Sequence, residues 1–206
     1  MKAKLWGVVA AFLFGAAMAA ATPPDEVVKT TTGKLQESIK AHQAEYKADP
    51  KKFYSVVDEI CTPHFDMPYI AQLILARNYR SASDDQRKRF QEAFKNMMIR
   101  SYANALLTYA DSLTTEWQPA RMAADATDTQ VNSQIKRPNG PPLPMGFAMR
   151  LKDGEWKVYD IIVENLSLVT NFRSQVGSEI KRTSLDAVIA KLETGDGIAT
   201  SKAGGS

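Results

Sequence analysis

The sequence predicts an α+β protein, in which about six or seven helices wrap a curled, four-stranded antiparallel sheet. Apolar residues recur at helical spacing through residues 22–111 and alternate with polar residues through most of residues 113–163. Helical spacing returns over residues 167–193. These lengths favour one domain over residues 22–194, followed by a flexible, glycine-rich tail over residues 195–206.

The first half of the chain predicts a series of helices. One should end before Pro50, a second should end at Pro63, and a third should cover residues 67–79. In "SDDQRKRF", Ser83 and Gln86 have the spacing of a capping box at a helix start. The long helix that follows should present one broad apolar face: Phe90, Phe94, Met97, Met98, Tyr102, Ala105, Leu106 and Tyr109.

Four later segments are predicted as strands: residues 114–121, 129–137, 145–151 and 155–163. Asp153 and Gly154 form a hairpin signal between the last two. Ser167 and Ser184 can cap two final helices, because a serine hydroxyl readily accepts a hydrogen bond from a free N–H group in the first turn.

The stretch "DGEWKVYDIIVENLSLVTNFRSQV", residues 153–176, places two apolar runs around a break at Glu164 and Asn165. Strict alternation gives its strand two apolar faces: Trp156, Val158 and Ile162 on one, and Tyr159, Ile161 and Val163 on the other. Such a strand is covered on both faces or lines a cavity. We expect the chain after the break, with the long helix opposite, to close over the concave face. A filled core and a ligand cavity both fit, and walls rich in Met and Tyr favour a cavity for variable apolar ligands.

The N-terminus has the layout of a signal peptide over residues 1–21: Lys2 and Lys4, an apolar run, then a series of alanines. An uncleaved membrane anchor is the alternative. Cleavage removes both lysines and lowers the net formal charge from +3 to +1. No basic stripe is interleaved with aromatic residues, so no nucleic-acid partner is expected. Cys61 is the only cysteine, which excludes an internal disulfide.

No catalytic residue, metal site or cofactor is expected. A hydrolase needs a nucleophile, a base and an oriented partner, and His42 and His64 are the only histidines. Cys61 lies three residues before His64, but packing as a small apolar residue is the simpler role for this thiol. Asp160 and Glu164 flank a strand end, where carboxylates can do acid–base chemistry or can cap and pair.

Three stretches resemble the MlaC family, the periplasmic phospholipid-binding components of the Mla lipid transport system, which include toluene-tolerance auxiliary proteins. They are "HFDMPYIAQLILARNYRSASDDQRKRFQEAFKNMMIRSYANALLTY", "DGEWKVYDIIVENLSLVTNFRSQV" and "LDAVIAKLE". The family often has Gly where Ala76 and Asn165 stand, Trp where Tyr79 stands, and Tyr where Phe172 stands. Asn165 can keep a left-handed turn, whereas Ala76 does so less easily, so residues 76–80 should differ locally.

The resemblance implies a sheet related to the NTF2-like fold and a deep apolar pocket that takes phospholipid acyl chains. It implies a carrier in the Gram-negative periplasm that moves phospholipid between an outer-membrane lipoprotein–porin complex and the inner-membrane Mla ABC transporter complex. This activity would maintain outer-membrane lipid asymmetry. A binder of another hydrophobic small molecule and a structural or adaptor protein without ligand are the alternatives.

The face assignments and the family architecture together give the expected lipid-binding residues: Ile70, Leu73, Ile74, Met98, Tyr102, Leu106, Val131, Met145, Phe147, Met149, Ile161, Val163, Val169 and Phe172. Arg80, Arg100 and Arg173 are candidates for the pocket mouth, near a phosphate. Plain core packing is the alternative for the apolar residues, and a solvated or structurally paired state is the alternative for the arginines.

Overall fold

The computed structural model describes residues 21–109, 114–120, 122–123, 125–137 and 140–195. Its elements follow in this order: α1 (Pro24–Ala48), α2 (Pro50–Cys61), the short 3₁₀ helix η1 (Thr62–His64), α3 (Met67–Leu75), α4 (Arg77–Ser81), α5 (Asp84–Tyr109), β1 (Thr114–Trp117), β2 (Asp128–Lys136), β3 (Leu143–Lys152), β4 (Glu155–Val163), β5 (Leu166–Ser167), α6 (Leu168–Arg182) and α7 (Leu185–Thr194). The α+β class is confirmed. The predicted signal peptide, except its last residue, and the predicted tail, except its first residue, lie outside the described residues.

The described sheet contains five strands in the order β1-β2-β3-β4-β5, and each neighbouring pair is antiparallel. The prediction of four strands was wrong because β5 has only two residues, too few to show alternation. Glu164 and Asn165, with φ angles of 51° and 65°, turn β5 back onto β4. Two successive positive φ angles are typical of a type I′ hairpin turn. The relationship to the NTF2-like fold stays a prediction.

A β-bulge in β4 interrupts its alternation. Met149 lies opposite Val158, but Ala148 lies opposite Asp160, which leaves Tyr159 as the extra residue. A bulge of this kind shifts every later side chain by one position relative to strict alternation. The predicted division of β4 into two faces was therefore wrong beyond Val158.

The bulge gathers the large apolar side chains of β4 on one face. Beyond it, Ile161 pairs with Phe147 and shares a face with Val158, whereas Ile162 pairs with Gly146 on the opposite, outer face. We call the apolar side the inner face of the sheet: Trp117, Val131, Met145, Phe147, Met149, Trp156, Val158, Ile161 and Val163.

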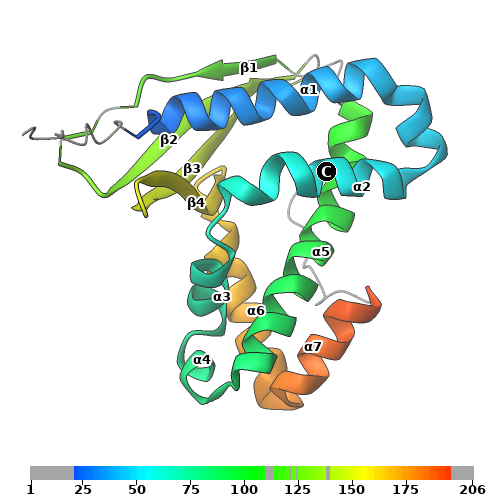
Figure 1. Cartoon of the computed structure of the whole chain (residues 1–206), viewed down its shortest axis with the longest axis vertical. Helices are drawn as coiled ribbons and strands as arrows, with labels where there is room; N and C mark the ends of the chain where they lie inside the picture. Colours follow the sequence, from blue (N-terminus) through cyan, green and yellow to red (C-terminus); the bar gives the residue numbers. More distant parts are fainter. Residues whose placement is uncertain (1–20, 110–113, 121, 124, 138–139, 196–206) are drawn as a thin grey trace, which may run out of the picture.

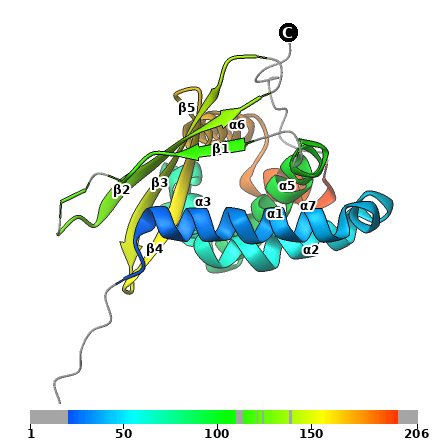
Figure 2. The same cartoon turned by 90° about the horizontal axis from the view of Figure 1, so that it is seen from above.

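The helices form two groups that α5 connects. In Figure 1, α2 returns beside α1, and α5 begins near α7 and ends at this pair. The helices α3, α4, α6 and α7 form the second group below the sheet (Figure 1). Val28 of α1 packs with Val131 and Met149, so α1 covers part of the inner face. Figure 2 shows α1 and α5 on the same side of the sheet.

Buried side chains form three clusters. The helical core joins α3, α5, α6 and α7: Ile70, Ala71, Ile74, Leu75, Phe90, Ala93, Phe94, Met97, Phe172, Val176, Val188, Ile189 and Leu192. The hairpin core joins α1, α2 and the second half of α5: Leu35, Ile39, Tyr46, Phe53, Val57, Ala103 and Leu107. The sheet core is Val28, Val131, Met149, Trp156 and Val158. Phe65 packs against both the helical core and the sheet core.

The apolar residues of α5 do not form one covered face. Phe94 lies in the helical core, whereas Ala103 and Leu107 lie in the hairpin core. Tyr102 and Leu106, which were predicted on the same face as Phe94, are 41% and 42% exposed. The prediction of a single covered face was wrong because the two halves of α5 pack against different helices.

Serine caps begin three of the helices where they were expected. The Ser83 hydroxyl accepts a hydrogen bond from the Gln86 N–H at 3.1 Å, and the Gln86 side chain accepts one from the Ser83 N–H at 3.0 Å. The Ser167 and Ser184 hydroxyls each accept from the N–H three residues later, at 2.9 and 3.1 Å. The capping box and both later caps are confirmed.

Asp66 joins the helices to the sheet. Its side chain is buried, accepts a hydrogen bond from the Tyr69 N–H at 3.3 Å, and thereby caps α3. The carboxylate also accepts from Lys152 Nζ at 3.0 Å and lies 3.5 Å from a guanidinium nitrogen of Arg150. Its backbone N–H donates to the Val158 carbonyl at 2.9 Å. One residue thus holds the start of α3 against β3 and β4.

The predicted helix over residues 67–79 is broken at Ala76, which has φ 49° and ψ −120°. This conformation is strained for any residue with a Cβ atom and is readily adopted only by glycine. The helix therefore ends at Leu75 and restarts as α4 at Arg77. The expectation of a local difference at this connection stays a prediction about the family.

We expect Ala76→Gly to raise the free energy of unfolding by about 1 kcal/mol, because relief of backbone strain exceeds the added entropy of the unfolded chain. Urea denaturation of the purified protein measures this. Ala44→Gly, at an exposed position inside α1, is the matched control and should lower the free energy of unfolding by about 1 kcal/mol. Equal losses in both variants would show that Ala76 carries no strain.

Candidate functional site

The first part of the candidate site is the end of the inner face that α1 leaves open. Val131 and Met149 are fully buried in the sheet core. Toward the start of β3 and the end of β4, the inner face is only half-buried: Met145, Phe147, Ile161 and Val163. The described residues therefore leave apolar surface here that is not fully covered.

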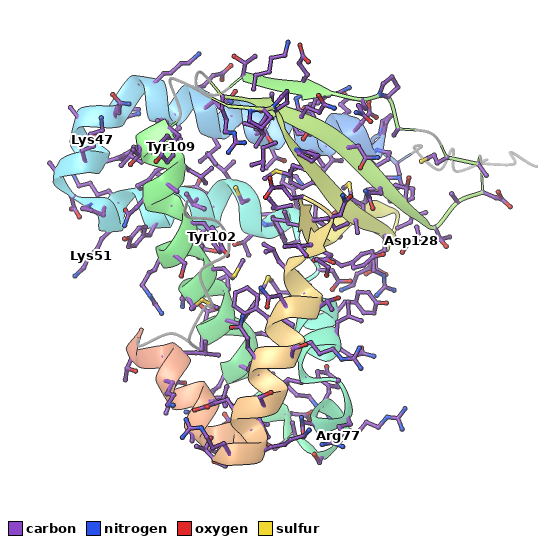
Figure 3. All side chains as sticks on the ribbon, turned by 180° about the vertical axis from the view of Figure 1, so that it is seen from behind. Lys47, Lys51, Arg77, Tyr102, Tyr109 and Asp128 are labelled. Carbon is purple, nitrogen blue, oxygen red and sulfur yellow. The ribbon has the colours of Figure 1, made fainter. Side chains whose placement is uncertain are left out.

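The second part is a row of side chains on α5, which we call the α5 stripe: Met98, Tyr102, Leu106 and Tyr109. Residues three or four positions apart share one side of a helix. Met98 is half-buried, and the next three are 41%, 42% and 54% exposed. Figure 3 shows Tyr102 partway along α5 and Tyr109 near the end beside α1. A contiguous row of exposed, large apolar side chains is typical of a binding surface.

The third part is the first turn of α6. Leu168 and Val169 are half-buried and pack against the helical core. The Asp160 carboxylate accepts a hydrogen bond from the Val169 N–H at 3.0 Å and another from the Ser167 hydroxyl, which holds this turn against β4. Of the two roles considered for Asp160, the structure shows the cap.

Met98, Leu168 and Val169 pack against the helical core. Phe147 and Ile161 pack against the sheet core. None of the side chains that define the site carries a charge. Such a surface can bind a hydrocarbon chain by removing it from water.

Eight of the expected lipid-binding residues belong to this site: Met98, Tyr102, Leu106, Met145, Phe147, Ile161, Val163 and Val169. Five are packed in closed cores: Ile70, Ile74 and Phe172 in the helical core, and Val131 and Met149 in the sheet core. Leu73 is half-buried on α3. These five residues are buried in the cores, and whether they contact lipid stays a prediction.

The three arginines differ in their surroundings. Arg100 is half-buried and donates a hydrogen bond to the Leu192 carbonyl at 2.9 Å, so it satisfies the end of α7. Arg80 and Arg173 are exposed on α4 and α6. Arg100 therefore has the structural pairing that was the alternative, and a headgroup role for Arg80 and Arg173 stays a prediction.

Two residues at or beside the site were not among the expected lipid-binding residues. Leu168 is the first residue of α6, directly after its N-cap Ser167. The predicted cap at Ser167 therefore marked the position of Leu168 at the start of the helix. Trp117 of β1 is half-buried, and its ring centroid lies 5.9 Å from that of Phe147. β1 has only four residues, and the connection after it shows no regular spacing of apolar residues, so no signal in the sequence predicted this contact.

Two hollows in the structure have linings that differ from the candidate site. One, of about 190 Å³, is on the outer side of the sheet and is lined mainly by carboxamides: Gln118, Gln130, Asn132, Gln134 and Asn165, with Gly146. The other, of about 200 Å³, lies between α5 and α7 and is lined in part by Arg89, Arg100 and Glu193. The first hollow meets the candidate site at Met145, which also belongs to its lining, and the second shares no residue with the site.

The chemistry near Cys61 does not favour a nucleophile. Burial, with the Asp58 carboxylate nearby, raises the pKa of the Cys61 thiol to about 11. Burial, with Lys157 and Lys34, lowers the pKa of His64. Activated thiols have lowered pKa values, so this environment favours a neutral, packed side chain.

Among the described residues, no group of three or more His, Cys, Asp or Glu side chains could hold a metal ion. None of the described helices is long and apolar enough to cross a membrane.

The raised pKa makes a testable statement about reactivity. At pH 8, the thiolate fraction of Cys61 should be about 100-fold lower than that of an unperturbed thiol, because its pKa rises from 9.0 to about 11. Alkylation by iodoacetamide should therefore be at least about 100-fold slower in the folded protein than in urea. Rapid labelling of the folded protein, with an apparent pKa below 9.0, would contradict this environment.

Comparison with known proteins adds independent information. A model of the MlaC protein family matches residues 29–194. A toluene tolerance protein of Pseudomonas putida is 34% identical over 168 residues, which cover 81% of this chain and 77% of that protein. The intermembrane phospholipid transport system binding protein MlaC of Haemophilus influenzae is 26% identical over 189 residues, which cover 90% of this chain and 88% of that protein.

A solved structure is also similar. The phospholipid-binding protein of Ralstonia solanacearum, determined in complex with a phospholipid, superposes with a TM-score of 0.77 at 28% identity. The match covers 85% of this chain and 97% of that one. The family match spans most of the chain, including the strands, α5 and α6 that make the candidate site. The chain belongs to the MlaC family.

Proposed function

We propose that the protein is a periplasmic phospholipid carrier that holds acyl chains at the candidate site. The observation that supports this most directly is the uncharged apolar surface formed by the inner face, the α5 stripe and the start of α6. Exposed apolar side chains in such a row are costly in water unless they have a partner. The relatives point to the same ligand class, since one is a phospholipid transport protein and another binds phospholipid.

The physical need for a carrier follows from the ligand. Each CH₂ group transferred into water costs about 0.8 kcal/mol, so a two-chain lipid loses tens of kcal/mol when it leaves a membrane unaccompanied. A carrier must replace most of that apolar contact and still release the lipid. Half-buried side chains on three separate elements suit this task, because they can close around a chain and separate again. The headgroup would then remain near solvent.

A transport role would combine the lipid-binding site with the predicted export of the protein. We propose that the protein shuttles phospholipid between the outer-membrane lipoprotein–porin complex and the inner-membrane Mla ABC transporter complex, and so maintains outer-membrane lipid asymmetry. Family membership and the predicted signal peptide support this role.

A transfer assay tests the carrier function. Donor vesicles containing a fluorescent phospholipid are separated from acceptor vesicles by a membrane that passes the protein but not vesicles. The wild-type protein should increase transfer in proportion to its concentration, and Leu106→Glu should increase it much less, because the carboxylate would be buried against lipid. No increase by folded wild-type protein would contradict carriage of phospholipid and would favour another hydrophobic ligand or an adaptor role.

A further inference from the structure

Tyr102 places a hydroxyl group in an otherwise apolar part of the site. Met98 lies one turn before it and Leu106 one turn after it on the α5 stripe. The Tyr102 hydroxyl makes no hydrogen bond to any residue that the structure describes. Partial burial raises the pKa of Tyr102. Tyr102 is nevertheless 41% exposed, so a ligand can reach its side chain.

A bound hydrocarbon chain would complete the withdrawal of Tyr102 from water. The hydroxyl would then lose its solvent partners, and Met98 and Leu106 offer no good acceptor in their place. A hydrogen bond to the ligand would replace these partners and is worth roughly two- to tenfold in affinity. A ligand that carries an acceptor at this position along the stripe therefore binds better than one that does not.

Two acceptors in a phospholipid could meet this hydroxyl, the ester carbonyl and the phosphate oxygen. A phosphate beside Tyr102 would lose its hydration among uncharged side chains, because no residue that defines the site is cationic. An ester carbonyl is neutral and lies at the junction between the acyl chain and the headgroup. The surroundings of Tyr102 therefore fit the ester.

We propose that the Tyr102 hydroxyl donates a hydrogen bond to an acyl ester carbonyl of the bound lipid, and that Tyr102 thereby selects ester lipids over lipids without this carbonyl. The inference rests on the proposed function and deepens it, because it assigns the chemical class that the site distinguishes.

The test compares a diacyl phosphatidylcholine with the dialkyl ether lipid of the same chain length and headgroup. Lipid-free protein is incubated with vesicles containing equal amounts of both, and the bound lipids are extracted and quantified by mass spectrometry. Wild-type protein should bind the ester form in about two- to tenfold excess, the range expected for one net hydrogen bond. Tyr102→Phe should bring the ratio to about one. Tyr54→Phe, which removes a hydroxyl from α2 beside the hairpin core, is the matched control and should keep the wild-type ratio.

Each other outcome separates this inference from the proposed function. Equal binding of the two lipids by wild-type protein would overturn the role of Tyr102 while leaving the carrier function intact. An unchanged ester preference in Tyr102→Phe would assign the selection to another group. A loss of both lipids in Tyr102→Phe, with the ratio preserved, would point to the shared phosphate. Binding of neither lipid by wild-type protein would contradict the proposed function itself.

Discussion

A Tyr102→Glu variant is expected to fold and to retain at least about tenfold less phospholipid than the wild type. Tyr102 is 41% exposed, so a glutamate there can remain hydrated in the lipid-free protein and should cost little stability. A lipid chain on the α5 stripe would remove water from that carboxylate, and an unpaired charge in an apolar contact is strongly unfavourable. The measurement is the amount of lipid extracted per mole of purified protein.

The matched control is Met122→Glu. Met122 is also a large apolar residue, 44% exposed, but it lies in the connection between β1 and β2, outside the candidate site. This variant should retain lipid at the wild-type level. If a folded Tyr102→Glu protein also carried a normal amount of lipid, the α5 stripe would not be part of the binding surface.

Replacing Asp66 with alanine should lower the free energy of unfolding by about 2–4 kcal/mol. The change removes the cap of α3 and the acceptor for Lys152, and it leaves the Tyr69 N–H without its side-chain partner. The loss stays below that of a fully buried ion pair, because the Lys152 and Arg150 side chains are 38% and 35% exposed and can turn toward water. Urea denaturation of lipid-free protein is the measurement, since bound lipid would add its own stabilisation.

Asp84→Ala provides the comparison for Asp66. Asp84 is also an aspartate at a helix start, and it pairs with Arg87 at 3.2 Å, but its side chain is 90% exposed. Its removal should change the free energy of unfolding by no more than about 0.5 kcal/mol. Similar small losses in both variants would show that Asp66 does not join α3 to the sheet in the way the contacts indicate.

Local signals predicted most of the helices and turns. Ser83 with Gln86, Ser167 and Ser184 each begin a helix, because their hydroxyls satisfy N–H groups that no helical carbonyl can reach. Asp153 and Gly154 both have positive φ angles, as their hairpin pattern requires. These features depend on a few neighbouring residues and are therefore readable from sequence.

Other features depend on partners distant in the chain. The bulge at Tyr159 exists only in the pairing of β4 with β3, and it moved Ile161 to the face of Val158. The cap and ion pairs of Asp66 involve Lys152 and Arg150, more than eighty residues away. No local pattern announces such contacts, and the spacing of apolar residues cannot reveal them.

The candidate site shows the same limit. Helical spacing identified the apolar residues of α5 correctly but could not tell which would be covered. Phe94 is buried because it packs with α3, α6 and α7 in the helical core. Tyr102 and Leu106 are exposed because α1 and α2 pack against a different side of α5. Phe172 packs edge-on against Phe94, with ring centroids 5.1 Å apart, and so joined the core instead of the site.

Native mass spectrometry of the protein purified from the periplasm, followed by extraction and identification of any bound molecule, tests the central claim most directly. The account predicts phospholipid bound to the chain, with mixed acyl compositions, because an uncharged apolar surface recognises chains and not headgroups. A clean mass for the unliganded protein, unchanged after incubation with phospholipid vesicles, would contradict it.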